Sequence, residues 1–219
     1  GVPVLLMDIK GDLSGIARPG TINQHIEKRH SIMGEPWEGK GSPVEFLSLS
    51  DEKGARMRAT VIEFGPVLLS RILDLNDIQA GVVSLAFKYC DDNGIPLLDL
   101  KDFKKVLQYL SNEGKDEIKE EYGAVSSTSV STIMRKIIEI EQQVADRFFG
   151  EESFNVDDLI RIDRNGKGIV SILRLTDIQD RPKLFSTFML SLLAEVYNSF
   201  PEVGDAEKPK LVLFIDEAH

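Results

Sequence analysis

The residues most able to do chemistry stand at the C-terminal end of the chain. Asp216 and Glu217 follow the apolar run Leu211–Ile215, and His219 comes two residues later. An apolar run without alternation predicts a strand covered on both faces, as in a parallel sheet. Carboxylates just past such a strand lie where open α/β sheets bind ligands. There Asp216 could hold Mg²⁺ through water, and Glu217 could polarise a water that attacks a phosphate. The alternative is a buried strand that ends in a solvated Asp-Glu pair.

A second group of charged residues follows an apolar run at the other end of the chain. Val2–Met7 predicts a buried strand, and Asp8, Lys10, Gly11 and Asp12 come directly after it. Carboxylates that meet Asp216 and Glu217 at one sheet edge would repel one another unless a cation lay among them. The pattern therefore favours Mg²⁺ with a nucleotide, with Lys10 facing phosphate or a neighbouring acid. In the alternative interpretation Asp8 caps a helix and Lys10 pairs with it at the surface.

Three other patterns resemble known sites but lack essential parts. The segment Gly34–Gly41 has the spacing of a phosphate-binding loop, but no strand precedes it and Gly41 stands where Ser or Thr should bind Mg²⁺. The segment Asp163–Gly168 resembles half of a calcium loop without its last ligands, so a β-turn is expected. His25 and His30 have no cysteine cluster nearby, and surface histidines are expected instead of a zinc site.

Composition and charge set the class of protein. The chain has 219 residues, 42% of them hydrophobic, which is enough for a sizeable core. The formal net charge of −10 argues against a surface that coats nucleic acid by simple electrostatics. No apolar run approaches the ~20 residues of a membrane span. The single cysteine, Cys90, cannot form an internal disulfide and suggests a reducing cytoplasm.

Periodicity predicts an α/β fold that is interrupted by helices. Alternation predicts a β-hairpin from strands at 44–49 and 57–61, and residues 16–43 are expected to be loop with at most a short helix. Helical spacing runs from about residue 65 to 149, and a further helix covers 184–196. We therefore predict a mostly parallel sheet with an all-helical insert and a small β-hairpin. The predicted segments are 1–66 and 150–219 for the α/β core and 67–149 for the insert.

Several segments together resemble a known family. They are Asp8–Gly15, Gly65–Asp77, Asp99–Asp102, Asp146–Gly150 and Lys208–His219. These segments are similar to the HerA–FtsK group of DNA-pumping ATPases, and most similar to the bacterial YjgR-type helicase-like proteins. The Asp-Glu-Ala-His ending alone is also found in the helicases named after it, but the chain shows no further motif of that class.

The resemblance implies a P-loop NTPase with an extra strand and a catalytic glutamate. It implies a cytoplasmic homo-hexamer that surrounds double-stranded DNA and uses ATP and Mg²⁺. In this family pattern Asp216 is the Walker B aspartate that holds Mg²⁺ through water, Glu217 is the catalytic glutamate, and His219 couples hydrolysis to motion. Asp8 matches an acidic position that faces the nucleotide. Its neighbours are assigned to nucleotide binding with it: Lys10, Gly11 and Asp12.

The chain also departs from the family pattern. The resemblance places the phosphate-binding loop (Walker A) before residue 1, and the arginine finger and sensor residues after residue 219. An arginine finger contributes ~10³ to 10⁵ in rate. We therefore expect the chain alone to be an inactive part of a DNA translocase, with an exposed sheet edge where the P-loop strand would lie. The alternative is a non-catalytic module that binds a partner protein through residues 67–149.

Overall fold

The computed structural model describes residues 1–142, 148–151, 155–178, 181–200, 202 and 204–216. Contacts between residues divide the chain into two units. The first comprises Gly1–Ala55, Val156–Thr176 and the C-terminal segment from Glu202. The second comprises Arg56–Asn155 and the segment that begins at Asp177. The predicted segments 1–66, 67–149 and 150–219 differ from this division, because residues 56–66, 150–155 and 177–200 group with the helices.

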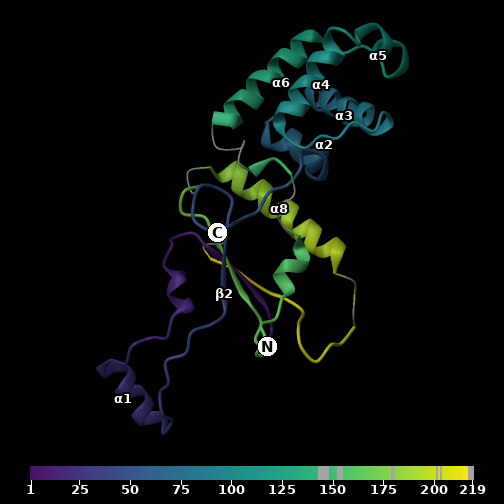
Figure 1. Ribbon diagram of the computed structural model, residues 1–219. Coiled ribbons are helices and arrows are strands. Elements are labelled where there is room, and N and C mark those ends of the chain that lie inside the picture. Colours follow the sequence, from purple (N-terminus) through teal and green to yellow (C-terminus); the bar gives the residue numbers. More distant parts are fainter. Residues whose placement is uncertain (143–147, 152–154, 179–180, 201, 203, 217–219) are drawn as a thin grey trace. The chain divides into compact units, whose positions relative to one another are not determined.

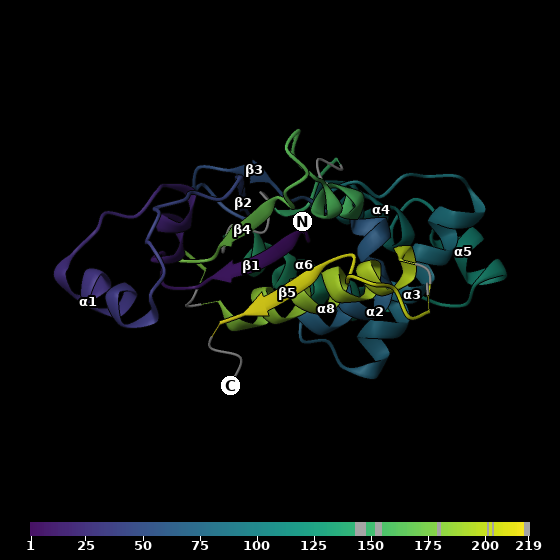
Figure 2. The ribbon, with the colours of Figure 1, turned by 90° about the horizontal axis from the view of Figure 1, so that it is seen from below.

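The first unit is built on a five-stranded sheet with the order β3-β2-β4-β1-β5. Parallel pairing joins β1 to β4 and β5, and β2 to β4, so the predicted mostly parallel sheet is confirmed (Figures 1 and 2). The strands are β1 (Val4–Asp8), β2 (Val44–Ser48), β3 (Ala55–Arg56), β4 (Val170–Arg174) and β5 (Val212–Ile215). Since parallel strands share one direction, the carboxyl ends of β1, β2, β4 and β5 lie at one edge of the sheet.

The core of this sheet lies along its central strands. Leu5 and Met7 of β1 and Ile172 and Leu173 of β4 are fully buried. Ile172 and Leu173 are adjacent and lie on opposite faces of β4, so both faces of that strand are covered, as a continuous apolar run favours. The same expectation is wrong for β5, where Phe214 is 55% exposed. Among the described residues β5 is an edge strand with β1 on one side, so part of its apolar run stays in contact with solvent.

The predicted hairpin is only half correct. The first strand is β2, but its neighbour β3 covers Ala55–Arg56, and the predicted strand 57–61 does not form. Thr60 is instead the N-cap of α2, and its side chain and that of Glu63 form a reciprocal capping box. This helix-start signal prevails over the β-propensity of Thr60 and Val61.

The segment 16–43 contains a longer helix than predicted. A 3₁₀ helix, η1, spans Leu13–Ala17, and α1 spans Gln24–Met33. The side chain of Asn23 accepts hydrogen bonds from the first turn of α1, and Gly34 ends the helix in the left-handed conformation. None of the residues in α1 is buried, which explains why the sequence showed no apolar stripe.

The second unit is helical, as predicted for the insert. Its helices are α2 (Val61–Ile72), α3 (Asp77–Asp92), α4 (Leu100–Ser111), α5 (Lys115–Glu121), α6 (Ser127–Ile140) and α8 (Pro182–Ser199). Asn76, Asp99 and Ser126 cap three of them through side-chain hydrogen bonds. Apolar residues at helical spacing are buried within it, as at Phe103, Leu107 and Ile133. The helix α5 is mostly charged, and among its residues Ile118 is buried.

Candidate functional site

Two of the predicted acids end adjacent parallel strands. Asp8 is the last residue of β1, and Asp216 directly follows β5. The register pairs Met7 with Ile215, so Asp8 and Asp216 stand at the same level of the carboxyl edge. Residues from the two extremes of the sequence are therefore neighbours in one sheet (Figure 2).

A cavity of about 500 Å³ opens beside this edge. Its charged lining residues are Lys10, Asp12 and Asp216, and its walls are apolar side chains of β1, β5 and η1. A volume in this range is typical of small-molecule sites. The structure thus brings three of the predicted site residues around one space that could hold a ligand.

Asp8 lies at the same edge but is buried rather than part of the cavity wall. Its side chain is fully inaccessible to solvent, and Oδ1 accepts a hydrogen bond of 2.7 Å from the backbone N–H of Gly11. Among the described residues, Oδ2 has no hydrogen-bond partner. A buried carboxylate oxygen without a partner is costly unless a cation or donor supplies one. Asp8 caps no helix, because the N-cap of η1 is Asp12.

Gly11 is needed for the turn after β1. Its φ of 79° lies in the left-handed region, and a Cβ there would come within 2.9 Å of Thr176 Cγ2. Both conditions favour glycine. This turn places the Gly11 amide against Asp8, so the backbone fixes the orientation of the buried carboxylate.

Two predicted residues, Glu217 and His219, lie outside the described residues. Their predicted roles as catalytic base and coupling residue therefore stay predictions. Asp216 is the last residue of the C-terminal segment that the structure places, and it is exposed.

The donor set fits a cation that is shared with a phosphate. In the described part of the chain, no three His, Cys, Asp or Glu side chains are grouped so as to hold a metal ion by themselves. Mg²⁺ usually takes one or two carboxylates and completes its shell with water and substrate phosphates. Asp8, with its unpartnered Oδ2, and Asp216 are suited to that smaller contribution.

Two of the three rejected patterns, Gly34–Gly41 and Asp163–Gly168, have structural roles. Gly34 ends α1, and the rest of Gly34–Gly41 is irregular chain in which Lys40 pairs with Glu38 at 2.7 Å. Asp163 Oδ1 accepts backbone hydrogen bonds from Lys167 and Asn165, and these bonds lower the pKa of the Asp163 carboxyl. Its segment is thus a turn, bounded by a bridge between Ile162 and Gly168.

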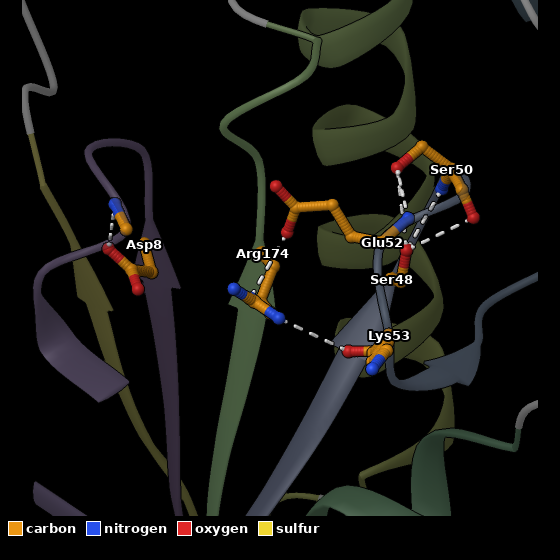
Figure 3. A network of polar contacts seen from close by, with 7 residues as sticks. Asp8, Ser48, Ser50, Glu52, Lys53 and Arg174 are labelled. Atoms are coloured by element: carbon orange, nitrogen blue, oxygen red, sulfur yellow. Dashed lines mark hydrogen bonds and ion pairs between the residues drawn. The ribbon is translucent and has the colours of Figure 1, made fainter. Parts of the chain in front are cut away.

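Sequence reasoning missed a polar row at the carboxyl edge. Arg174 ends β4 and is in register with Asp8 on one side and with Ser48 of β2 on the other. Arg174 pairs with Glu52 (Figure 3). The sequence contains a pattern that could have indicated this row: Arg174 follows the buried run Val170–Leu173, just as Asp8 follows the apolar residues of β1.

Comparisons with known proteins give one match over the whole chain. The model of the family described as Helicase HerA-like C-terminal matches residues 1–219. A search of curated proteins finds no match. Within the described residues, no helix is long and apolar enough to cross a membrane.

Solved structures of the bacterial coupling protein TrwB are weakly similar. The unbound monoclinic form of TrwBdeltaN70 has 11% sequence identity and a TM-score of 0.40, and the match covers 97% of this chain and 55% of TrwBdeltaN70. TrwB in complex with ADP and Mg²⁺ has 10% identity and a TM-score of 0.38, with 98% and 56% covered. The chain therefore spans about half the length of these proteins. At these TM-scores the likeness supports no conclusion about the chain.

Proposed function

Because the chain belongs to the helicase HerA-like C-terminal family, we propose that it is part of an ATP-hydrolysing motor that moves or unwinds DNA. The observation that carries the proposal is that Asp8 and Asp216 end adjacent strands at one sheet edge, beside a cavity lined by Lys10, Asp12 and Asp216. The reaction of the intact protein is hydrolysis of ATP to ADP and phosphate. Its partners are double-stranded DNA and further copies of the protein in a hexameric ring.

Each site residue has a role in this proposal. Asp216 holds the water shell of Mg²⁺, and Glu217 orients and deprotonates the attacking water. Mg²⁺ neutralises charge on the phosphates when it is bound. Lys10 offers a positive charge to phosphate, and the turn at Gly11 holds Asp8 toward the cation. Asp12 borders the nucleotide, and His219 couples the site to movement.

The described residues supply only part of such a site. We propose that the phosphate-binding loop and the arginine finger belong to other segments of the protein or to a neighbouring subunit. A phosphate-binding loop contributes a row of backbone N–H groups and a lysine, which dominate the affinity for triphosphate. In this proposal the chain contributes the carboxylates of the site, and other parts of the protein contribute the groups that bind triphosphate.

The alternative, a protein-binding module, has weaker support. Val67 and Ile78 on the helical unit are 67% and 73% exposed. Single exposed apolar residues are ordinary on soluble proteins and do not identify an interface. The carboxylate edge is the more specific observation, so the motor remains the function we propose.

The decisive variant is Glu217→Gln in the intact protein. We expect it to abolish ATP turnover while nucleotide binding persists, because glutamine fills the same space but cannot act as a base. Steady-state phosphate release and equilibrium nucleotide binding measure the two effects. Glu207→Gln, in the exposed loop before β5, is the matched control and should leave both unchanged. Turnover at the parental rate in Glu217→Gln would refute the assignment of the base.

A further inference from the structure

The row of residues that ends the parallel strands has an arginine in its middle. The strand order places β4 between β1 and β2, and the register aligns Asp8, Arg174 and Ser48. Adjacent strands lie about 4.8 Å apart, and residues in register on parallel strands project to the same side of the sheet. Arg174 is therefore the cationic side chain next to Asp8 in this row (Figure 3).

Arg174 nevertheless turns away from Asp8 and toward the loop after β2. Its Nε lies 3.1 Å from Glu52 Oε2, and its Nη1 donates a hydrogen bond of 3.5 Å to the carbonyl oxygen of Lys53. The guanidinium carbon lies 5.6 Å from the centre of the Phe46 ring. Nε and Oε2 form an ion pair but not an aligned hydrogen bond. The ion pair, the hydrogen bond and the ring contact of the Arg174 side chain thus all lie on the side of β2.

The loop that carries Glu52 is built to hold it there. Ser48 Oγ accepts a hydrogen bond of 3.1 Å from the Ser50 amide, and Ser50 Oγ accepts one of 3.3 Å from the Glu52 amide. Both serines are buried. Gly54, at the end of the loop, packs so closely against β2 that a Cβ there would come within 2.7 Å of the Phe46 carbonyl oxygen. The bonds from backbone amides to the serine hydroxyls and the close packing at Gly54 therefore fix the main chain at Glu52, from which the carboxylate reaches Arg174.

Asp8 is left with an unused oxygen as a result. Oδ2 is buried and has no hydrogen-bond partner among the described residues, although an arginine stands beside it in the row. If Glu52 did not hold Arg174, the strongest available partner for a buried carboxylate would be this guanidinium. A bond between Arg174 and Asp8 would then occupy the oxygen that a cation requires.

We propose that Glu52 is a positioning residue, which holds Arg174 against β2 and so keeps the guanidinium from occupying Asp8 Oδ2, the buried oxygen that a divalent cation would bind. The proposal rests on the proposed function, because it concerns the cation of that same site. Glu52 touches neither the cation nor the nucleotide. It acts through Arg174, and its removal damages the site only while Arg174 is present.

A Mn²⁺ titration of the chain tests this dependence. Paramagnetic broadening of the Gly11 amide resonance reports Mn²⁺ at Asp8, since that amide is bonded to Asp8 Oδ1. We expect Glu52→Gln to weaken Mn²⁺ binding about fivefold, the effect of one exposed to half-buried ion pair. The double variant Glu52→Gln with Arg174→Met should restore the parental affinity. Parental affinity in Glu52→Gln, or no recovery in the double variant, would overturn the proposal.

A matched control removes a different ion pair of the same strand. Glu45 of β2 pairs with Arg161, and neither residue takes part in the row at the carboxyl edge. Glu45→Gln should therefore leave Mn²⁺ broadening unchanged. An equal loss in Glu45→Gln and Glu52→Gln would assign the effect to general damage of β2 and would contradict the role of Glu52.

A second readout does not depend on metal. The Nε–Hε resonance of Arg174 should move in Glu52→Gln, and adding Asp8→Asn should move it again, because the new partner is then lost. In the parental chain Asp8→Asn should leave this resonance in place. No response to Asp8→Asn in the Glu52→Gln background would overturn the proposal. If Asp8→Asn left the Mn²⁺ broadening unchanged, Asp8 would not be a cation ligand, and that part of the proposed function would be wrong. The Arg174 resonance would still show whether Glu52 keeps Arg174 away from Asp8.

Discussion

The carboxylate of Asp8 shows how a single residue is prepared for a ligand. The side chain is buried, one oxygen is bonded to the Gly11 amide, and the other has no partner among the described residues. Native proteins rarely leave such an atom unsatisfied without a functional reason. Asp8 thus combines a buried oxygen that has no partner among the described residues with an orientation that the glycine turn after it fixes.

Replacement of Gly11 by alanine tests this turn. The left-handed φ and the approach to Thr176 should together cost about 1–2 kcal/mol of folding free energy. Urea unfolding followed by circular dichroism measures the loss. Gly15→Ala is the control, because a Cβ at Gly15 would meet no atom within 4 Å. Equal stability of the two variants would mean that the turn does not require glycine.

At the scale of elements, caps decide where the helices of the second unit begin. The reciprocal bonds of Thr60 and Glu63 start α2, and corresponding boxes start α3 at Asn76 and α4 at Asp99. Inside α2, Gly65 leaves the helical conformation just before Pro66, which cannot donate a backbone hydrogen bond. The cap at Thr60 therefore holds a short first turn that the rest of the helix supports poorly.

We expect Thr60→Ala to destabilise the helical unit by about 1 kcal/mol. The variant removes the hydroxyl of Thr60, which is buried, and leaves the Glu63 amide without the acceptor that lies 3.2 Å away. Chemical denaturation gives the change in free energy. Thr128→Ala, at an exposed position in the first turn of α6, should have a much smaller effect. A similar loss in both variants would argue against the capping box as the cause.

At the scale of the whole molecule, the sheet joins residues that are more than two hundred positions apart. Asp8 and Asp216 meet because β1 and β5 pair in parallel. Among the described residues β5 is an edge strand, and the side chain of Phe214 on it is exposed. The net charge of −10 still argues against DNA binding through a broad basic surface. The chain thus presents carboxylates but few groups that would attract a triphosphate.

The chain by itself should therefore bind ATP weakly and should not hydrolyse it. Lys10 is the positive side chain that lines the cavity of about 500 Å³, whereas Asp12 and Asp216 repel phosphate. Isothermal titration with Mg-ATP should give no micromolar affinity. The titration with Mg²⁺ omitted is the control for non-specific heats. A micromolar dissociation constant would show that the chain holds a complete phosphate site.

Local pattern predicted the elements whose signals lie within a few residues. The strand after Gly1, the helical spacing between residues 65 and 149 and the turn at Asp163 follow from neighbouring positions in the sequence. The same reasoning misplaced the strand at 57–61, because the cap at Thr60 competes with its β-propensity. It also missed most of α1, whose exposed residues carry no apolar stripe.

The sequence by itself determined which residue types could do chemistry and that each group follows an apolar strand. Only the tertiary structure decided that β1 lies between β4 and β5, that one oxygen of Asp8 has no partner in the described part of the chain, and that Arg174 pairs with Glu52. The physical reason is the distance along the chain over which each interaction acts. Propensity, capping and turn formation depend on atoms a few residues apart, whereas strand order and side-chain pairing depend on which distant surfaces exclude water together.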